Sequence, residues 1–130
     1  GCAICQQNGG KCVQDDDMAE ILDKVVKADV IVLSTPVYFY IMNGQMKTFI
    51  DRCLPRYEEI SNKEFYFICT SVDPDRAVIE KTLSGLRDFT DDCLDNCIER
   101  GVICGIDTAV KGAIEDTPAY ERAYEIAKNI

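Results

Sequence analysis

The apolar positions of the chain alternate between short continuous runs and helix-like stripes. The run Val30 to Leu33 lacks polar alternation and is typical of a strand covered on both faces, as in a parallel sheet. Phe65 to Cys69 and Val102 to Ile106 predict a second and a third strand. We expect Pro36 to stop the first strand. The order helix, strand, helix, strand, helix, strand, helix predicts parallel strands in the order first, second, third, with helices on both faces.

Four helices are expected around these strands. In the first helix, Asp17 and Glu20 form a candidate capping pair. The apolar stripe of that helix is Met18, Ile21, Leu22, Val25 and Val26. The second helix follows a turn signal at Asn43-Gly44 and ends at Pro55. Its inward face is Met46, Phe49, Ile50, Cys53 and Leu54.

The third and fourth helices each open beside a proline. Asp73-Pro74 predicts the start of a long third helix with proline at its first position, broken near Gly85. Its inward residues are Ile79, Leu83, Leu86, Phe89, Cys93 and Cys97. Thr117-Pro118 opens the last helix, whose expected buried face is Tyr120, Ala123, Tyr124 and Ala127. We therefore expect one α/β domain over residues 1–130, with a cysteine-rich loop at 1–14 and the α/β body at 15–130.

Composition and charge narrow the classes of function. The 130 residues are 47% hydrophobic, which is enough for a real core. The net charge is −9, from 23 acidic and 14 basic residues, and a nucleic-acid partner would need a basic face instead. No apolar run approaches the ~18 residues of a membrane span, and no signal peptide pattern opens the chain. We expect a cytoplasmic protein without a membrane partner.

The chemistry-bearing residue types restrict the mechanism. Histidine is absent, which excludes a histidine base or metal ligand, so an enzyme would need another reactive group such as a bound redox cofactor. Five of the eight cysteines lie inside apolar patterns and are expected in the core; they are Cys53, Cys69, Cys93, Cys97 and Cys104. A disulfide framework is not expected without a secretion signal.

Ligands of open α/β sheets bind beyond the carboxyl ends of the strands. That rule selects three stretches: Ser34 to Gly44, Thr70 to Asp73, and Asp107 to Asp116. The first is unusual because Tyr38 to Met42 is aromatic and apolar where a loop should be polar. A flat aromatic ligand would stack on it, but packing on the core or a dimer contact remains an equal alternative.

The stretch from Ala28 to Arg52 reads ADVIVLSTPVYFYIMNGQMKTFIDR and resembles the NAD(P)H-dependent FMN reductase family, including the iron–sulfur flavoproteins. The matching residues are Thr35, Pro36, Val37, Tyr38, Asn43, Gly44, Lys47, Phe49, Ile50, Asp51 and Arg52. The resemblance implies a flavodoxin-like, three-layer parallel sheet with FMN at the end of the first predicted strand. It implies a cofactor-binding set of Thr35, Pro36, Val37, Tyr38, Phe39, Asn43 and Gly44, with Thr70 and Ser71 on the other side. We assign Lys47 and Arg52 a structural role, and no residue a catalytic one.

The family also begins with a strand and a phosphate-binding loop that have no counterpart in this sequence. We therefore expect an N-terminally incomplete fold in which the first predicted strand has an open edge. Such an edge recruits other chains. We expect this open edge, or the aromatic stretch Tyr38 to Met42, to pair with a second copy or with a front fragment of the same protein. The family resemblance favours a homodimer or homotetramer.

The first residues form a second candidate site. Cys2, Cys5 and Cys12 are spaced C-x2-C-x6-C, which is similar to the last three cysteines of the motif that binds a [4Fe–4S] cluster in iron–sulfur flavoproteins. A cluster needs four protein ligands as a rule, and this loop offers three. The alternative, a loop of free thiols, stays open.

The leading hypothesis is an FMN-dependent NAD(P)H oxidoreductase that passes electrons to a small-molecule acceptor or a redox protein: a quinone, another flavin or an iron–sulfur centre. A flavodoxin-like electron carrier without enzymatic activity is the second, and the acidic charge suits it. A redox or metal-sensing module built on the cysteine loop is the third. The sequence does not name the acceptor and does not choose between NADH and NADPH.

Overall fold

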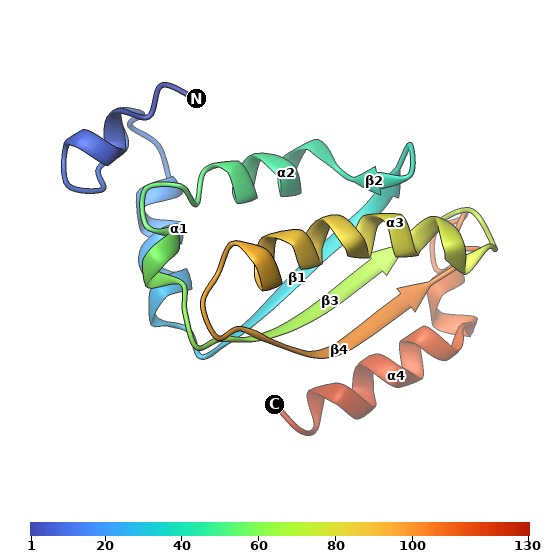
Figure 1. Cartoon of the computed structure of the whole chain (residues 1–130). Helices are drawn as coiled ribbons and strands as arrows, with labels where there is room; N and C mark the ends of the chain where they lie inside the picture. Colours follow the sequence, from blue (N-terminus) through green and yellow to red (C-terminus); the bar gives the residue numbers. More distant parts are fainter.

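A central sheet of four strands organises the chain (Figure 1). The computed structural model describes all of residues 1–130. The strands are β1 (Val30–Tyr38), β2 (Ile41–Met42), β3 (Glu64–Thr70) and β4 (Ile98–Gly105), in the spatial order β2-β1-β3-β4. β1, β3 and β4 are parallel neighbours, so the predicted parallel sheet and its strand order are confirmed. Only β2 runs antiparallel, against the end of β1.

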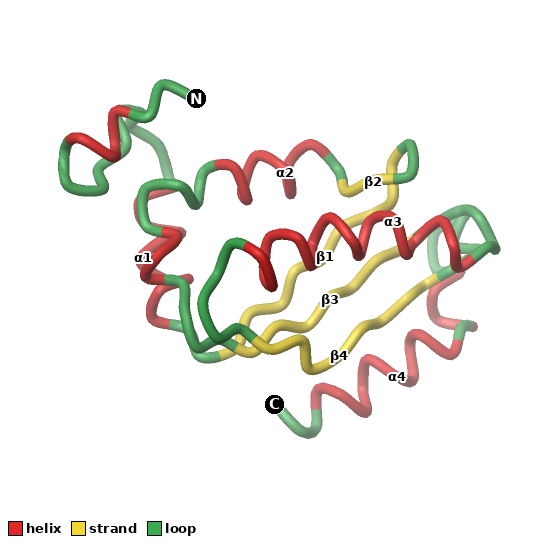
Figure 2. The backbone as a smooth tube through the Cα atoms, in the orientation of Figure 1, coloured by secondary structure: helices red, strands yellow, loops and turns green.

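The helices form a layer on each face of the sheet, as predicted (Figure 2). α1 (Met18–Lys27), α2 (Gly44–Asp51) and α3 (Arg76–Arg87) pack on one face, and α4 (Pro118–Ala127) packs on the other. Short 3₁₀ turns occupy Ile4–Gln7, Tyr57–Glu59 and Ala113–Asp116. No helix combines the length and apolar composition that a membrane crossing requires.

The two faces of the sheet carry cores of very different size. The core under α1, α2 and α3 contains 15 buried residues, whereas the core under α4 contains four: Tyr66, Ile103, Ala119 and Ile126. α4 lies over β3 and β4 and leaves the same face of β1 open, so Val32 is 50% exposed while Ile31 and Leu33 are buried. The prediction that this strand is covered on both faces is therefore wrong; it is covered on one.

The end of β1 also differs from the prediction. Pro36 does not stop the strand, because the strand continues to Tyr38 and Pro36 pairs in register with Thr70. Proline is tolerated there because β1 has no partner strand on its other side until β2 begins to pair at Val37. β2 is an additional strand that the hydrophobic pattern did not predict.

Helix boundaries shift where side-chain caps act. Asp17 makes no capping bond; the Asp16 carboxylate accepts the Met18 N–H at 3.1 Å instead. Asn43-Gly44 is the start of α2 and not a turn, because the Asn43 side chain accepts the Met46 N–H at 2.9 Å. α2 ends at Asp51, short of the predicted end at Pro55.

α3 begins after Pro74, not at it, because the Asp75 carboxylate caps the helix by accepting the Ala77 N–H at 2.9 Å. The helix is unbroken at Gly85 and ends at Arg87 in a π-helical turn, Asp88–Asp92. Cys93 lies beyond that turn and is exposed, so its predicted core position is wrong. Cys53 and Cys69 are buried as predicted, and Cys97 and Cys104 are partly buried.

The buried face of α4 is rotated from the predicted one. Ala119 and Ile126 face the sheet with the partly buried Ala123, at the spacing i, i+4, i+7. Tyr120 and Tyr124 point outward and form an edge-to-face pair with ring centroids 5.3 Å apart. The predicted inward position of these two tyrosines is wrong, because the smaller alanines allow the closer approach to the sheet.

Candidate functional site

The predicted ligand-binding stretches meet at the carboxyl ends of the parallel strands, called the carboxyl edge of the sheet below. Pro36 pairs in register with Thr70, and Thr70 pairs with Gly105, so the loops that follow β1, β3 and β4 are neighbours (Figure 1). Thr35 lies opposite Cys69 in the same ladder. The register thus brings together Pro36 and Thr70, two candidate residues that lie 34 positions apart in the sequence.

The most prominent feature of this edge is a hairpin of apolar residues from Val37 to Met42, called the aromatic hairpin below. Val37 pairs with Met42 and Tyr38 with Ile41, which leaves Phe39 and Tyr40 as a two-residue turn. Both turn residues have positive φ, 50° and 71°. That conformation suits Asn-Gly, and it costs other residues about 1–2 kcal/mol each.

The aromatic hairpin presents its side chains to solvent. Tyr38 is 60% exposed and Phe39 is 98% exposed, and Tyr40 and Ile41 are also exposed. Packing on the chain's own core, one of the two alternatives for this stretch, is therefore ruled out for these four side chains. Local strain combined with exposed aromatic surface indicates that something other than the stability of this chain explains these residues.

α3 supports the aromatic hairpin from behind. Met42 is buried, and its Cε lies 3.1 Å from where a Cβ on Gly85 would stand. The Thr82 hydroxyl donates to the Tyr40 carbonyl at 3.4 Å, and the Lys81 ammonium lies 4.5 Å from the centre of the Tyr40 ring. These α3 residues carry no recognisable signal in the sequence, because only the tertiary contact with the hairpin gives them a role.

The base of the aromatic hairpin is closed by Thr35. Its side chain is buried, with 1% exposed, and its hydroxyl donates to the Pro36 carbonyl at 2.9 Å. The same oxygen accepts the Asn43 N–H at 3.0 Å. Asn43 in turn caps α2, so one hydroxyl connects the strand, the hairpin and the helix.

Ser71 joins the loops after β3 and β4. Its N–H donates to the Gly105 carbonyl at 2.8 Å, and its own carbonyl accepts the Thr108 N–H at 3.0 Å and the Thr108 hydroxyl at 3.1 Å. The buried Ser71 hydroxyl accepts the Asp73 N–H at 3.0 Å. Ser71 therefore lies at the predicted edge of the sheet with its polar groups engaged in loop structure.

The groups at this edge fit a planar ring that carries hydrogen-bond acceptors. The aromatic hairpin offers exposed rings for stacking. The first N–H groups of α2, on Gly44 and Gln45, have no acceptor within the chain, and Gly44 has no atom within 4 Å of the place where a Cβ would stand. An isoalloxazine ring has an apolar end and an edge that includes nitrogen and oxygen acceptors, so exposed rings beside free N–H groups would suit FMN.

The cysteine loop lies away from this edge, at the other end of α2 (Figure 1). Cys5 is buried, whereas Cys2 and Cys12 are exposed. No three histidine, cysteine, aspartate or glutamate side chains in the chain lie close enough together to hold a metal ion. The three cysteines, in this conformation, do not fit the ligand set of a cluster.

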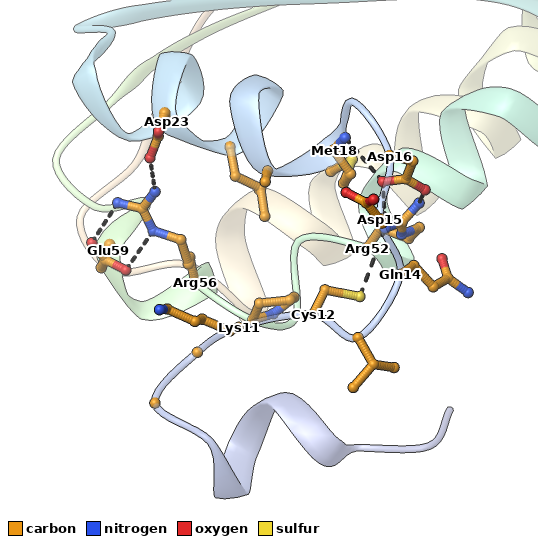
Figure 3. A pocket seen from close by; sticks show the side chains of 16 residues that line it. Lys11, Cys12, Gln14, Asp15, Asp16, Met18, Asp23, Arg52, Arg56 and Glu59 are labelled. Carbon is orange, nitrogen blue, oxygen red and sulfur yellow. Dashed lines mark hydrogen bonds and ion pairs between the residues drawn. The ribbon is translucent and has the colours of Figure 1, made fainter.

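Cys12 instead contacts Arg52, the last residue of the matching motif (Figure 3). The Cys12 Sγ lies 3.7 Å from Arg52 Nη2, and that nitrogen also donates to Asp16 Oδ1 at 2.9 Å. Arg52 Nη1 makes a second contact, with Asp16 Oδ2. A hydrogen bond from the backbone of Gln14, with a smaller contribution from Arg52, lowers the pKa of the Cys12 thiol. The structural role assigned to Arg52 is therefore one of anchoring the cysteine loop to the end of α2.

A pocket of about 530 Å³ lies between the cysteine loop, α1 and the turn after α2 (Figure 3). Both arginines that line it are already paired: Arg52 binds Asp16, and Arg56 binds Asp23 and Glu59. Arg56 Nε lies 2.7 Å from Glu59 Oε1. These ion pairs fix the loop and turn in place, and they leave no arginine in the pocket without a carboxylate partner.

Comparison with known proteins identifies the family. Residues 3–88 match the family of NADPH-dependent FMN reductases. The chain belongs to that family. The match covers α1, α2, β1, β2, β3 and α3, and so it includes the whole aromatic hairpin.

Curated relatives of this FMN reductase family member include iron–sulfur flavoproteins of archaea. One from Archaeoglobus fulgidus is 49% identical over 55 residues, which are 42% of this chain and 24% of that protein. One from Methanosarcina thermophila is 30% identical over 136 aligned positions, covering 99% of this chain and 68% of that protein. In the relatives with the higher identities, the matched stretch thus spans about a quarter of their length.

Solved structures confirm the flavodoxin-like α/β fold. The Trp repressor binding protein of Bacillus subtilis aligns with a TM-score of 0.72 at 21% identity, over 83% of this chain and 68% of its own. A flavodoxin, WrbA-like protein of Agrobacterium tumefaciens gives 0.62 at 18%, over 88% and 78%. General stress protein 14 of Treponema denticola, solved with FMN, gives 0.64 at 17%, over 96% and 75%.

Proposed function

We propose that this protein is an FMN-dependent oxidoreductase that takes reducing equivalents from NADH or NADPH and passes them to a quinone, a flavin or an iron–sulfur acceptor. The observation that carries the proposal is the match of residues 3–88 to the FMN reductase family, because that range contains the exposed aromatic hairpin at the carboxyl edge of the sheet. The FMN complex of a protein with the same fold supports the choice of cofactor.

Different residues would bind different parts of the flavin. Tyr38 and Phe39 would contact the flavin ring, and the free N–H groups of Gly44 and Gln45 would donate to its polar edge. Thr70 approaches from the neighbouring strand, beside Pro36. Bound FMN supplies the hydride and electron chemistry. The chain's own part is to hold and orient the ring and to exclude water, which agrees with the lack of histidine at the site.

Titration of the intact protein with FMN tests the proposal. We expect quenching of flavin fluorescence and a shifted flavin absorption band, followed by bleaching of that band when NADH or NADPH is added without oxygen. Tyr38→Ala should weaken FMN binding roughly tenfold, through the loss of ring stacking and buried area. Tyr124→Ala removes an equally exposed tyrosine from α4 and should leave binding unchanged. A protein that takes up no FMN at saturating concentration contradicts the proposal.

The net charge of the chain favours one alternative function that uses the same cofactor, that of an electron carrier. A net charge of −9 suits a carrier that docks on basic redox partners, because acidic surfaces steer such encounters. A carrier would bind FMN and be reduced by dithionite, but neither NADH nor NADPH would reduce it. That result would indicate a flavodoxin-like electron carrier and would reject the reductase activity.

A further inference from the structure

We propose that Thr35 is a positioning residue, whose buried hydroxyl fixes the aromatic hairpin and the start of α2 in one geometry without touching the ligand. The family resemblance places Thr35 among the flavin contacts, whereas its position in the structure assigns it a different role. The identity of the ligand rests on the proposed function. The role of the hydroxyl rests on the hydrogen bonds of the chain alone.

The side chain of Thr35 points into the protein. Ile31, Leu33 and Thr35 occupy alternate positions of β1, and all three are buried on the face that packs against α1, α2 and α3. Only 1% of Thr35 is exposed, so a ligand on the outer surface of the aromatic hairpin would meet other residues first. Its hydroxyl is also engaged within the chain, because its hydrogen is donated to the Pro36 carbonyl and its oxygen accepts the Asn43 N–H.

The two partners of the hydroxyl flank the aromatic hairpin. Pro36 precedes it and Asn43 follows it, so one oxygen bridges the chain where it enters and where it leaves. The hairpin has only two residue pairs, and short two-stranded hairpins are marginal on their own. Its turn also contains two strained residues. A bond at the base is therefore needed to keep the aromatic side chains in one arrangement.

The same bond reaches the backbone donors. The Asn43 side chain accepts the Met46 N–H at 2.9 Å, and the Asn43 carbonyl accepts the Lys47 N–H at 3.1 Å. Gly44 and Gln45, which carry the free N–H groups, lie between these anchors. Displacement of Asn43 would therefore move the donors together with the hairpin. Thr35 sets the spacing between the stacking surface and the hydrogen-bonding edge.

Two substitutions in the intact protein separate the hydroxyl from the shape of the side chain. Thr35→Ser keeps the hydroxyl, and Thr35→Val replaces it with a methyl group of similar size. In Thr35→Val the Asn43 N–H loses its acceptor, and we expect the dissociation constant for FMN to rise about tenfold. The visible circular dichroism of the bound flavin should change as well. Thr35→Ser should match the wild type in both measurements.

A second readout needs no ligand. Amide hydrogen exchange at Asn43, followed by NMR in the FMN-free protein, should be slow in the wild type and in Thr35→Ser, and faster in Thr35→Val. Melting temperatures of all three proteins show whether the change is local. If Thr35→Val does not fold, Thr35→Ala removes the same hydroxyl with less crowding, and the Thr35→Ser result still applies.

The proposal is overturned if Thr35→Val binds FMN with wild-type affinity and dichroism, if its Asn43 amide stays protected, or if Thr35→Ser loses affinity as the valine variant does. Failure of the wild type to bind FMN would reject the proposed function instead. The exchange measurement at Asn43 would then still decide whether the hydroxyl closes the hairpin.

Discussion

Replacement of Phe39 by asparagine should stabilise the protein while it weakens flavin binding. Phe39 is the first residue of the hairpin turn, with φ at 50°, and its side chain is 98% exposed. The ring buries almost nothing within the chain, so the substitution acts on stability through the backbone alone. Asparagine tolerates the left-handed conformation and is the preferred residue at this place in such turns.

The expected magnitude follows from the strain at this residue. A bulky residue in the left-handed region costs about 1–2 kcal/mol, and asparagine removes part of that cost. Phe39→Asn should therefore raise the free energy of unfolding by about 0.5–1 kcal/mol, or the melting temperature by about 2–5 °C for a chain of this size. Tyr40→Gly should be nearly neutral, because it relieves similar strain but loses the Lys81 contact and adds glycine entropy, each about 0.5–1 kcal/mol.

Urea and thermal unfolding of the FMN-free protein, followed by far-ultraviolet circular dichroism, measure the effect. Phe39→Val is the matched control, because a β-branched residue is the least compatible with positive φ and should destabilise the protein. FMN titration of Phe39→Asn should show weaker binding through loss of the ring. Equal destabilisation by asparagine and valine would refute the assignment of strain to Phe39.

Four further predictions concern the cysteines and the assembly. Iodoacetamide should modify Cys12 at a lower pH in the wild type than in Arg52→Gln. The Gln14 backbone and, to a smaller extent, Arg52 lower the pKa of the Cys12 thiol, and the substitution removes the contribution of Arg52. Identical pH profiles would contradict this. Cys53 and Cys69 should resist the reagent in the native state, because burial raises the pKa of each thiol to about 12, and rapid labelling in peptide mass spectra would count against their burial. Aerobic preparations should contain no intact iron–sulfur cluster, and stoichiometric iron and sulfide would show otherwise. The chain should associate along the Val30 to Leu33 edge of β1, which β2 does not cover, or through the aromatic hairpin, and sedimentation of a folded monomer would oppose that.

The main strands were predictable because continuous apolar runs of strand length leave little alternative in an α/β chain. β2 was not predictable, because two residues carry no periodicity and because Pro36 was expected to end the first strand. Asn43-Gly44 is ambiguous in sequence, since asparagine favours both turns and helix caps, and only the fold decides between them. In α4, alanines and tyrosines repeat at the same helical spacing, so the pattern alone could not tell which set faces the sheet.

The location of the candidate site was predictable from the rule that ligands bind beyond strand ends. The buried position of Thr35 was within reach, because it continues the alternation of Ile31 and Leu33, but the strand was expected to end before it. The contact between Cys12 and Arg52 joins residues 40 positions apart and has no signature in local spacing. Contacts of that kind depend on how α1 and α2 pack, which no short sequence motif encodes.

The unequal cores of the two faces imply that the chain does not open as a single cooperative unit. α4 is attached through a cluster of four buried residues, whereas α1, α2 and α3 share a core of 15. Detachment of α4 therefore takes only a fraction of the free energy of global unfolding. The state so formed keeps a native front layer but uncovers Tyr66 and Ile103 across the back of the sheet. Protease cleavage and aggregation would proceed from this partially open state, at a rate set by how tightly one ten-residue helix is docked.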